Sequence, residues 1–182
     1  MISLPNIVTF ARLLSVPLTI WLMIDGNMTA AFWVFIAAGV SDGIDGYLAK
    51  RFNARTELGA YLDPLADKTL LVATYLTLGW LGQLPSWLVI LVVFRDLMIV
   101  GGALVVHALT QSFKSRPMLI SKLNTALQIA LVTFVLARLG LGFEDHGISR
   151  ILAFAVGVST VLSGFAYLIH WARRLARLEG SA

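Results

Sequence analysis

Six long apolar segments, separated by short breaks, constrain the fold of this chain more than any other feature. They cover residues 8–24, 30–49, 59–81, 85–109, 119–139 and 148–175. Each is near the roughly 20 residues that a helix needs to cross a bilayer core. They are too long for membrane barrel strands and lack the alternation of such strands. The sequence therefore predicts an all-α integral membrane protein with six transmembrane helices.

The composition agrees with a membrane protein of one domain. The chain of 182 residues is 58% hydrophobic and 13% charged, whereas soluble domains have about 25% charged residues. The length predicts a single transmembrane domain over 1–182. Cysteine is absent, which excludes disulfides and thiolate metal sites. The start of the sequence has no basic region, so we expect no cleavable signal peptide.

The basic residues predict the orientation in the membrane. Lys and Arg gather at every second boundary, after segments two, four and six: Lys50, Arg51, Arg55, Lys114, Arg116, Lys122, Arg173, Arg174 and Arg177. The other boundaries carry only Arg138 and Arg150, beside acidic residues. Because cytoplasmic loops are rich in Lys and Arg, we expect both termini in the cytoplasm. The expected location is the bacterial inner membrane.

Four carboxylates interrupt the apolar sequence around the second break. On helices, Asp42 and Asp45 would be i, i+3 neighbours, and Asp63 and Asp67 would be i, i+4 neighbours. Two facing helices would then direct four acids to one point, where they must protonate, pair or bind cations. Oxygen ligands suit Mg²⁺ or Mn²⁺. The alternative is a solvated turn, but ionisable residues in membrane-length segments are usually functional. We therefore predict a polar, metal-containing cavity at the cytoplasmic side, with these four residues as ligands.

The spacing of this stretch resembles a known family signature. From Asp42 it has the pattern D-x-x-D-G-x-x-A-K, then eight residues, then G-x-x-x-D-x-x-x-D ending at Asp67. It is similar to the signature of the CDP-alcohol phosphatidyltransferases, except that Lys50 stands where the family has Arg. The resemblance implies CDP-diacylglycerol as donor, CMP as leaving group and two divalent cations. Asp67 is the candidate general base, because it is last on its helical face and nearest to the cytoplasmic basic residues.

The first segment extends the resemblance to the donor site. Asn6, Thr9 and Arg12 are spaced by three and share a helical face. They fit a capped helix start with a cytoplasmic Arg. They also resemble the start of the family, where this segment helps to form the nucleotide pocket and the Arg could reach a phosphate. Lys50 keeps the charge but loses the planar contact of Arg. The predicted CDP-diacylglycerol site is Asn6, Thr9, Arg12, Gly46, Ala49, Lys50 and Gly59.

Later basic residues are candidates for binding the acceptor. Arg95 lies mid-segment beside Asp96, and the two either pair with each other or leave Arg95 to bind an anionic acceptor. Lys122 either extends its ammonium group to the membrane interface, as long basic side chains often do, or binds lipid phosphate. Residues 94–99 and 117–128 resemble the CMP-releasing cardiolipin synthases more than the phosphatidylglycerophosphate synthases. We therefore predict phosphatidylglycerol as acceptor, bound by Arg95, Arg116 and Lys122.

Two other functions remain open at this level. Glycerol 3-phosphate could be the acceptor, as in phosphatidylglycerophosphate synthases. A divalent-cation transporter would also need acids, but transporters usually show inverted repeats or broken helices, and no convincing repeat is present. The expected partners are lipid substrates and the membrane, with no nucleic acid. A homodimer is implied by the family, and Gly101, Gly102 and Gly157 would permit close helix approach.

Overall fold

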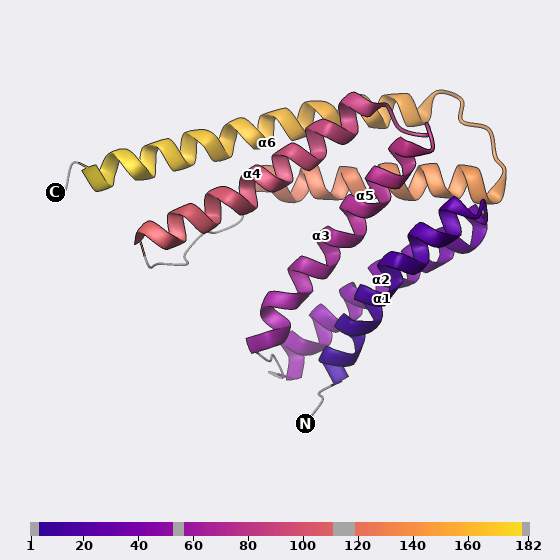
Figure 1. Cartoon of the computed structure of the whole chain (residues 1–182), viewed down its shortest axis with the longest axis horizontal. Helices are drawn as coiled ribbons and strands as arrows, with labels where there is room; N and C mark the ends of the chain where they lie inside the picture. The colour runs from indigo at the N-terminus through magenta and orange to yellow at the C-terminus, as the bar shows by residue number, and fades with distance from the viewer. Residues whose placement is uncertain (1–3, 53–56, 111–118, 180–182) are drawn as a thin grey trace. The chain divides into compact units, whose positions relative to one another are not determined.

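In the part that the computed structural model describes, the chain forms α-helices joined by short turns and loops (Figure 1). The backbone is described for residues 4–52, 57–110 and 119–179, and the side chains for 11–41, 68–102 and 119–171. The helices are α1 (Leu4–Ile24), α2 (Met28–Phe52), α3 (Glu57–Trp80), α4 (Ser86–Thr110), α5 (Leu119–Leu141) and α6 (Ile148–Glu179). Each predicted segment falls on one of them, so the all-α prediction is confirmed.

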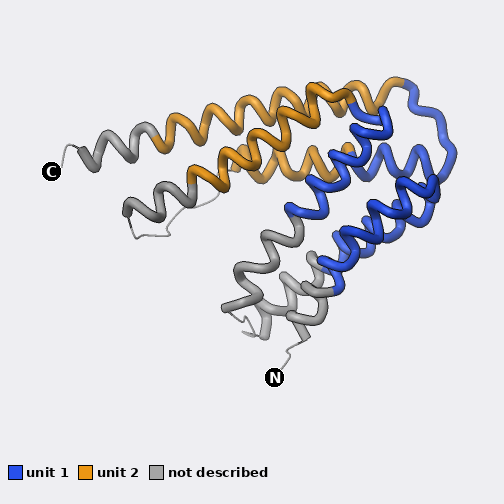
Figure 2. The backbone as a smooth tube through the Cα atoms, viewed as in Figure 1, with its two compact units in different colours: residues 1–84, 132–146 blue, residues 85–131, 147–182 orange. Residues whose placement is uncertain are grey.

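The helices divide into two compact units (Figure 2). Unit 1 comprises Met1–Leu84 and Val132–His146, and unit 2 comprises Pro85–Leu131 and Gly147–Ala182. In unit 1, α1 packs against both α2 and α3. In unit 2, α4 packs against α6. The helix α5 begins in unit 2 and ends in unit 1.

Two turns of the same kind end α1 and α3. Gly26 and Gly82 have φ of 84° and 70°, a region that costs glycine little. The amide after Gly26 donates to the Leu22 carbonyl at 2.9 Å. The amide after Gly82 donates to the Leu78 carbonyl at 2.8 Å. Both are Schellman motifs, so the breaks predicted after the first and third segments are tight helix ends.

The described helices bury polar side chains and expose large apolar ones. The buried polar residues are Arg12, Thr19, Thr74, Thr77, Arg95, Asp96, Asn124, Gln128, Thr160 and Ser163. By contrast, Leu14, Trp21, Ile90, Phe94, Leu97 and Phe165 are each at least 60% exposed. In a bilayer, polar groups must find partners inside the protein while apolar side chains face lipid. This distribution is typical of a membrane protein.

Within the described residues, two helices are long and apolar enough to cross a membrane. They are Leu119–Leu141 and Ile148–Trp171. Six membrane crossings therefore remain a prediction. The predicted metal cavity falls on side chains outside the described set.

Glycines of unit 2 allow α4 and α6 to approach each other closely. A Cβ at Gly157 would lie 2.8 Å from the Trp87 ring, and a Cβ at Gly102 would overlap the Trp171 ring. The close helix approach predicted at these two glycines therefore occurs within the chain. Neither glycine supplies support for the expected homodimer, which stays a prediction.

Candidate functional site

The four acids of the predicted metal site lie on two helices of unit 1. Asp42 and Asp45 belong to α2. Asp63 and Asp67 belong to α3. The helical spacing predicted for each pair is therefore confirmed. Their side chains lie outside the described residues, so their convergence on one point stays a prediction.

The donor chemistry of these four residues fits a divalent cation. Four carboxylates offer only oxygen ligands, which hard ions such as Mg²⁺ and Mn²⁺ prefer. Among the residues whose side chains are described, no group of three or more His, Cys, Asp or Glu could hold a metal ion. The acids on α2 and α3 are not in that set, so the predicted ligand set rests on residue type and helical spacing.

Arg12 is a buried cation on α1, the helix that packs against both α2 and α3. Its side chain is 3% exposed, and α1 packs against both acid-bearing helices. The hydroxyl of Ser15 donates to the Arg12 carbonyl at 2.6 Å, and Thr19 donates to the Ser15 carbonyl at 2.7 Å. These hydroxyls are therefore satisfied within α1. The burial of Arg12 fits a role inside the protein rather than a solvated cytoplasmic end.

The other predicted donor-site residues lie on the same three helices. Asn6 and Thr9 are in α1, and Gly59 is in α3. Gly46, Ala49 and Lys50 are in α2. Their side chains lie outside the described residues. Their contact with the nucleotide stays a prediction.

A buried polar cluster occupies unit 2 around Arg95. Arg95 is 2% exposed, and its guanidinium donates to Asp96 at 2.6 Å. Its second terminal nitrogen donates to the hydroxyl of Ser121 on α5 at 2.7 Å and to that of Ser163 on α6. The Tyr167 ring lies 6.0 Å from the Arg95 carbon Cζ, at the limit of a cation–π contact. Arg95 thus joins α4, α5 and α6. It pairs with Asp96, as the first of the two predicted alternatives has it, and its role in binding an acceptor stays a prediction.

A second group of hydroxyls continues this cluster along α5 and α6. Asn124 is fully buried, and its Oδ1 accepts from Ser159 at 2.7 Å and from Thr160 at 2.9 Å. The Asn124 amide nitrogen and the Arg95 Nε are buried without a hydrogen-bond partner among the described residues. Such buried donors are costly unless they are satisfied. These two donors could form hydrogen bonds to anionic or hydroxyl oxygens.

The predicted acceptor residues are placed differently from one another. Arg95 is at the centre of the cluster, whereas Lys122 is exposed on α5. Since successive helical residues are rotated by about 100°, Lys122 is turned away from its neighbour Ser121, which faces Arg95. Arg116 lies outside the described residues. Of the two predicted acceptor residues on described helices, Arg95 is therefore buried and Lys122 is exposed.

Sequence reasoning missed the residues that α6 contributes. Ser159, Ser163 and Tyr167 recur every fourth residue in an apolar segment. That spacing places them on one helical face, and it was the signal that could have found them. From this face, Ser163 accepts a hydrogen bond from Arg95 and Ser159 donates one to Asn124.

Comparison with known proteins identifies the family. Residues 2–170 match the family model of the CDP-alcohol phosphatidyltransferases. A cardiolipin synthase (CMP-forming) / mitochondrial hydrolase fusion protein of Schizosaccharomyces pombe is 34% identical over 92% of this chain and 31% of its own length. A chloroplastic CDP-diacylglycerol–glycerol-3-phosphate 3-phosphatidyltransferase of Oryza sativa is 32% identical over 93% of this chain and 57% of its own length. The cardiolipin synthase (CMP-forming) of Homo sapiens is 29% identical over 97% of this chain and 64% of its own length.

The chain spans less than two thirds of the length of each of these relatives. The matched region nevertheless covers all four acids and the polar cluster around Arg95. Members of this family are membrane proteins that generally use divalent metal ions. The chain belongs to the CDP-alcohol phosphatidyltransferase family.

Proposed function

We propose that this chain transfers a phosphatidyl group from CDP-diacylglycerol to phosphatidylglycerol, giving cardiolipin and CMP. The observation that supports the transfer is the family match together with the helical spacing of the acids on α2 and α3. Relatives that are cardiolipin synthases support the acceptor.

The acids of unit 1 would carry the chemistry. Asp67 takes the proton from the primary hydroxyl of the acceptor. The hydroxyl oxygen then forms a bond to the phosphorus that bears diacylglycerol, and the bond from that phosphorus to the oxygen of CMP breaks. Two divalent cations, held by Asp42, Asp45 and Asp63 with Asp67 as a shared ligand, would supply charge neutralisation of the pyrophosphate.

The residues of the predicted donor site would hold the nucleotide. Arg12 is buried on α1 and would meet a phosphate. Lys50 offers a single ammonium where the family has a guanidinium, so it contributes charge without a bidentate contact. Gly46, Ala49 and Gly59 would leave room for the nucleotide beside the helix backbone.

Arg95 would orient the acceptor. A lipid phosphodiester carries one charge, which one guanidinium and neighbouring hydroxyls can meet. The cluster on α4, α5 and α6 provides this combination in a buried setting. Arg116 and Lys122 would attract the same anion closer to the membrane surface.

The second candidate acceptor is glycerol 3-phosphate. The Oryza sativa relative, a CDP-diacylglycerol–glycerol-3-phosphate 3-phosphatidyltransferase, is about as similar to this chain as the Schizosaccharomyces pombe cardiolipin synthase fusion protein. A phosphomonoester brings nearly two charges, so it would favour more converging cations than Arg95 alone.

One assay separates these functions. Purified protein receives labelled CDP-diacylglycerol with either phosphatidylglycerol or glycerol 3-phosphate, and mass spectrometry identifies the product. We expect cardiolipin and CMP, with Mg²⁺ or Mn²⁺ required and turnover lost in excess EDTA. Phosphatidylglycerophosphate without cardiolipin would show the other acceptor. Metal transport without CMP release would show that the chain is a transporter.

The Asp67→Asn variant tests the proposed base. It keeps the shape of the side chain, so donor binding should persist while the rate falls by about 10²–10⁴-fold. The control is Asp42→Asn, which should weaken metal and donor binding together. A rate above about a tenth of the parent for Asp67→Asn contradicts its role as base.

The topology belongs to the same proposal. The chain would cross a bacterial inner membrane six times, with both termini in the cytoplasm. Two copies would form a homodimer. The basic boundaries support this orientation. The chain lacks cysteine, so a single cysteine added at the C-terminus gives a clean label. Reaction with an impermeant reagent from outside intact cells would contradict a cytoplasmic C-terminus. Crosslinking in native membranes measures the oligomeric state.

A further inference from the structure

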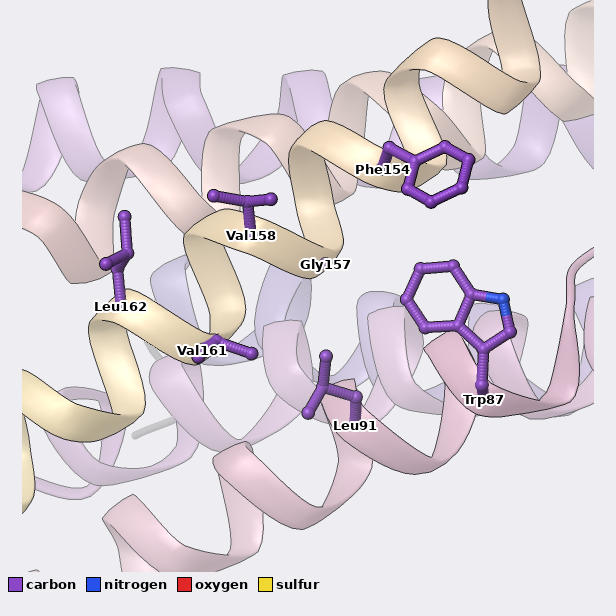
Figure 3. A pocket seen from close by; sticks show the side chains of 7 residues that line it. All are labelled: Trp87, Leu91, Phe154, Gly157, Val158, Val161 and Leu162. Atoms are coloured by element: carbon purple, nitrogen blue, oxygen red, sulfur yellow. The ribbon is translucent and has the colours of Figure 1, made fainter.

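An apolar groove runs between α4 and α6 in unit 2 (Figure 3). Its volume is about 490 Å³, and its lining residues are Trp87, Leu91, Phe154, Gly157, Val158, Val161 and Leu162. Every lining residue is apolar apart from the indole nitrogen of the tryptophan. The groove opens outward, since Val158 is 59% and Leu162 is 53% exposed.

The rim of the groove depends on a glycine and two aromatic rings. Figure 3 shows the Trp87 ring beside Gly157, with the Phe154 ring across from it. The centroids of these two rings are 5.8 Å apart and their planes are inclined by 37°. Any side chain at position 157 would displace Trp87. The groove is therefore bounded at one end by rings and remains open along α6.

The groove continues along α4 toward the polar cluster. Trp87, Leu91 and Arg95 are spaced by four and share one face of the helix. Leu91 lies about 6 Å along the axis from Arg95, at 1.5 Å per residue. On α6, the lining residue Leu162 directly precedes Ser163, which accepts a hydrogen bond from Arg95. One face of unit 2 thus passes from a purely apolar groove to a buried guanidinium.

We propose that this groove holds an acyl chain of the acidic phospholipid whose phosphodiester meets Arg95. An acyl chain has no polar atom along its length, and the groove is lined by apolar side chains. Asp96 already balances the charge of the Arg95 guanidinium, but the buried Nε has no hydrogen-bond partner among the described residues and can donate to the phosphodiester at the head of that chain. The inference rests on the proposed function, in that the bound lipid is the acceptor, and it explains how the site would select a lipid over a soluble alcohol.

Photolabelling tests the groove without measuring turnover. The full chain is placed in phosphatidylcholine vesicles with a trace of phosphatidylglycerol that carries a diazirine in one acyl chain. After illumination, mass spectrometry maps the labelled peptides. Parallel samples carry the same diazirine on phosphatidylcholine or on CDP-diacylglycerol. We expect phosphatidylglycerol to label residues 87–91 and 154–162 more strongly than the other two lipids do.

A matched pair of variants locates the effect. Leu162→Trp fills the groove, and Ile169→Trp makes the same kind of change at a residue of α6 that is 51% exposed and does not line it. Leu162→Trp should lower labelling at the groove by about tenfold, the effect of a small mismatch in an apolar pocket. Ile169→Trp should leave it unchanged. Equal labelling in both variants would overturn the proposal.

Other occupants give different results. Equal labelling by phosphatidylcholine would show a surface for bulk lipid, and stronger labelling by CDP-diacylglycerol would assign the groove to the donor; either result overturns the proposal. A disulfide-linked dimer of Val158→Cys in vesicles would show a second copy there and also overturn it. Because labelling needs no reaction, selective labelling by phosphatidylglycerol without CMP release would uphold the groove while the proposed function fails.

Discussion

Two arginine–aspartate pairs in this chain use the same chemistry in different surroundings. In unit 2, Arg95 and Asp96 lie 2.6 Å apart with side chains 3% and 7% exposed. In unit 1, Arg138 and Asp145 lie 3.7 Å apart with side chains 24% and 28% exposed. The first pair is short and buried within a helix bundle. The second pair is longer and lies where α5 gives way to the following loop.

The surroundings of each pair indicate its role. Arg138 also donates to the Gln83 side chain at 2.8 Å, so it ties the end of α5 to the turn after α3 within unit 1. Arg95 instead gathers hydroxyls from α5 and α6. A buried pair is costly to desolvate and is weak evidence for stability by itself. Arg138 thus stabilises a turn, whereas the burial of Arg95 has a free-energy cost that a functional role would explain.

The largest expected effect comes from breaking the buried pair on one side only. Arg95→Met leaves Asp96 buried beside an apolar side chain, which should lower the free energy of unfolding by about 3–5 kcal/mol. Denaturant unfolding in detergent micelles measures it, with Arg138→Met as the matched control. A loss below about 1 kcal/mol would mean that Asp96 is adequately solvated by other groups.

Replacing both members of the pair separates stability from activity. Arg95→Met/Asp96→Leu should recover most of the stability lost in the single variant, because no uncompensated charge remains. Its kcat/KM for phosphatidylglycerol should stay at least about tenfold below the parent, the effect of losing a charged hydrogen bond. Recovery of full activity would show that the pair is structural.

The polar cluster can be probed at one hydroxyl. Thr160 donates to Asn124 on another helix at 2.9 Å, whereas Thr77 donates within its own helix to the Ala73 carbonyl at 2.8 Å. Both threonines are buried. Thr160→Val should lower the unfolding free energy by about 0.6–1.7 kcal/mol, as for hydrogen bonds between membrane helices. Thr77→Val is the control, and an equal loss there would contradict a special role for the cluster.

The smallest expected effect is at the partly exposed pair, Arg138 and Asp145. Arg138→Met should change the unfolding free energy by about 0.2–1 kcal/mol, the usual range for such pairs. The rate of CMP release should remain within about twofold of the parent, a difference below about 0.4 kcal/mol in the barrier. Loss of activity without loss of stability would place Arg138 in the reaction and remove the contrast between the two pairs.

Much of the helical framework could be predicted from local sequence. The apolar segments, the glycines after the first and third of them, and the i, i+3 and i, i+4 spacing of the acids depend on residues close in the chain. The positive φ at Gly26 and Gly82 marks the turns at the breaks after the first and third segments. The exposure of Lys122 agrees with one of its two predicted alternatives, a side chain that reaches the membrane interface. Sequence spacing could not choose between them, because the packing of Ser121 and Asn124 decides which side of α5 faces the other helices.

The family signature and the helices follow from the local sequence. The side chains that surround Arg95 and the groove between α4 and α6 follow from how the helices pack against one another. Ser121 is 26 residues and Ser163 is 68 residues from Arg95 in sequence. Helix formation follows from neighbours within one turn. The cluster and the groove instead depend on helix packing, which Gly157 permits by making room for Trp87.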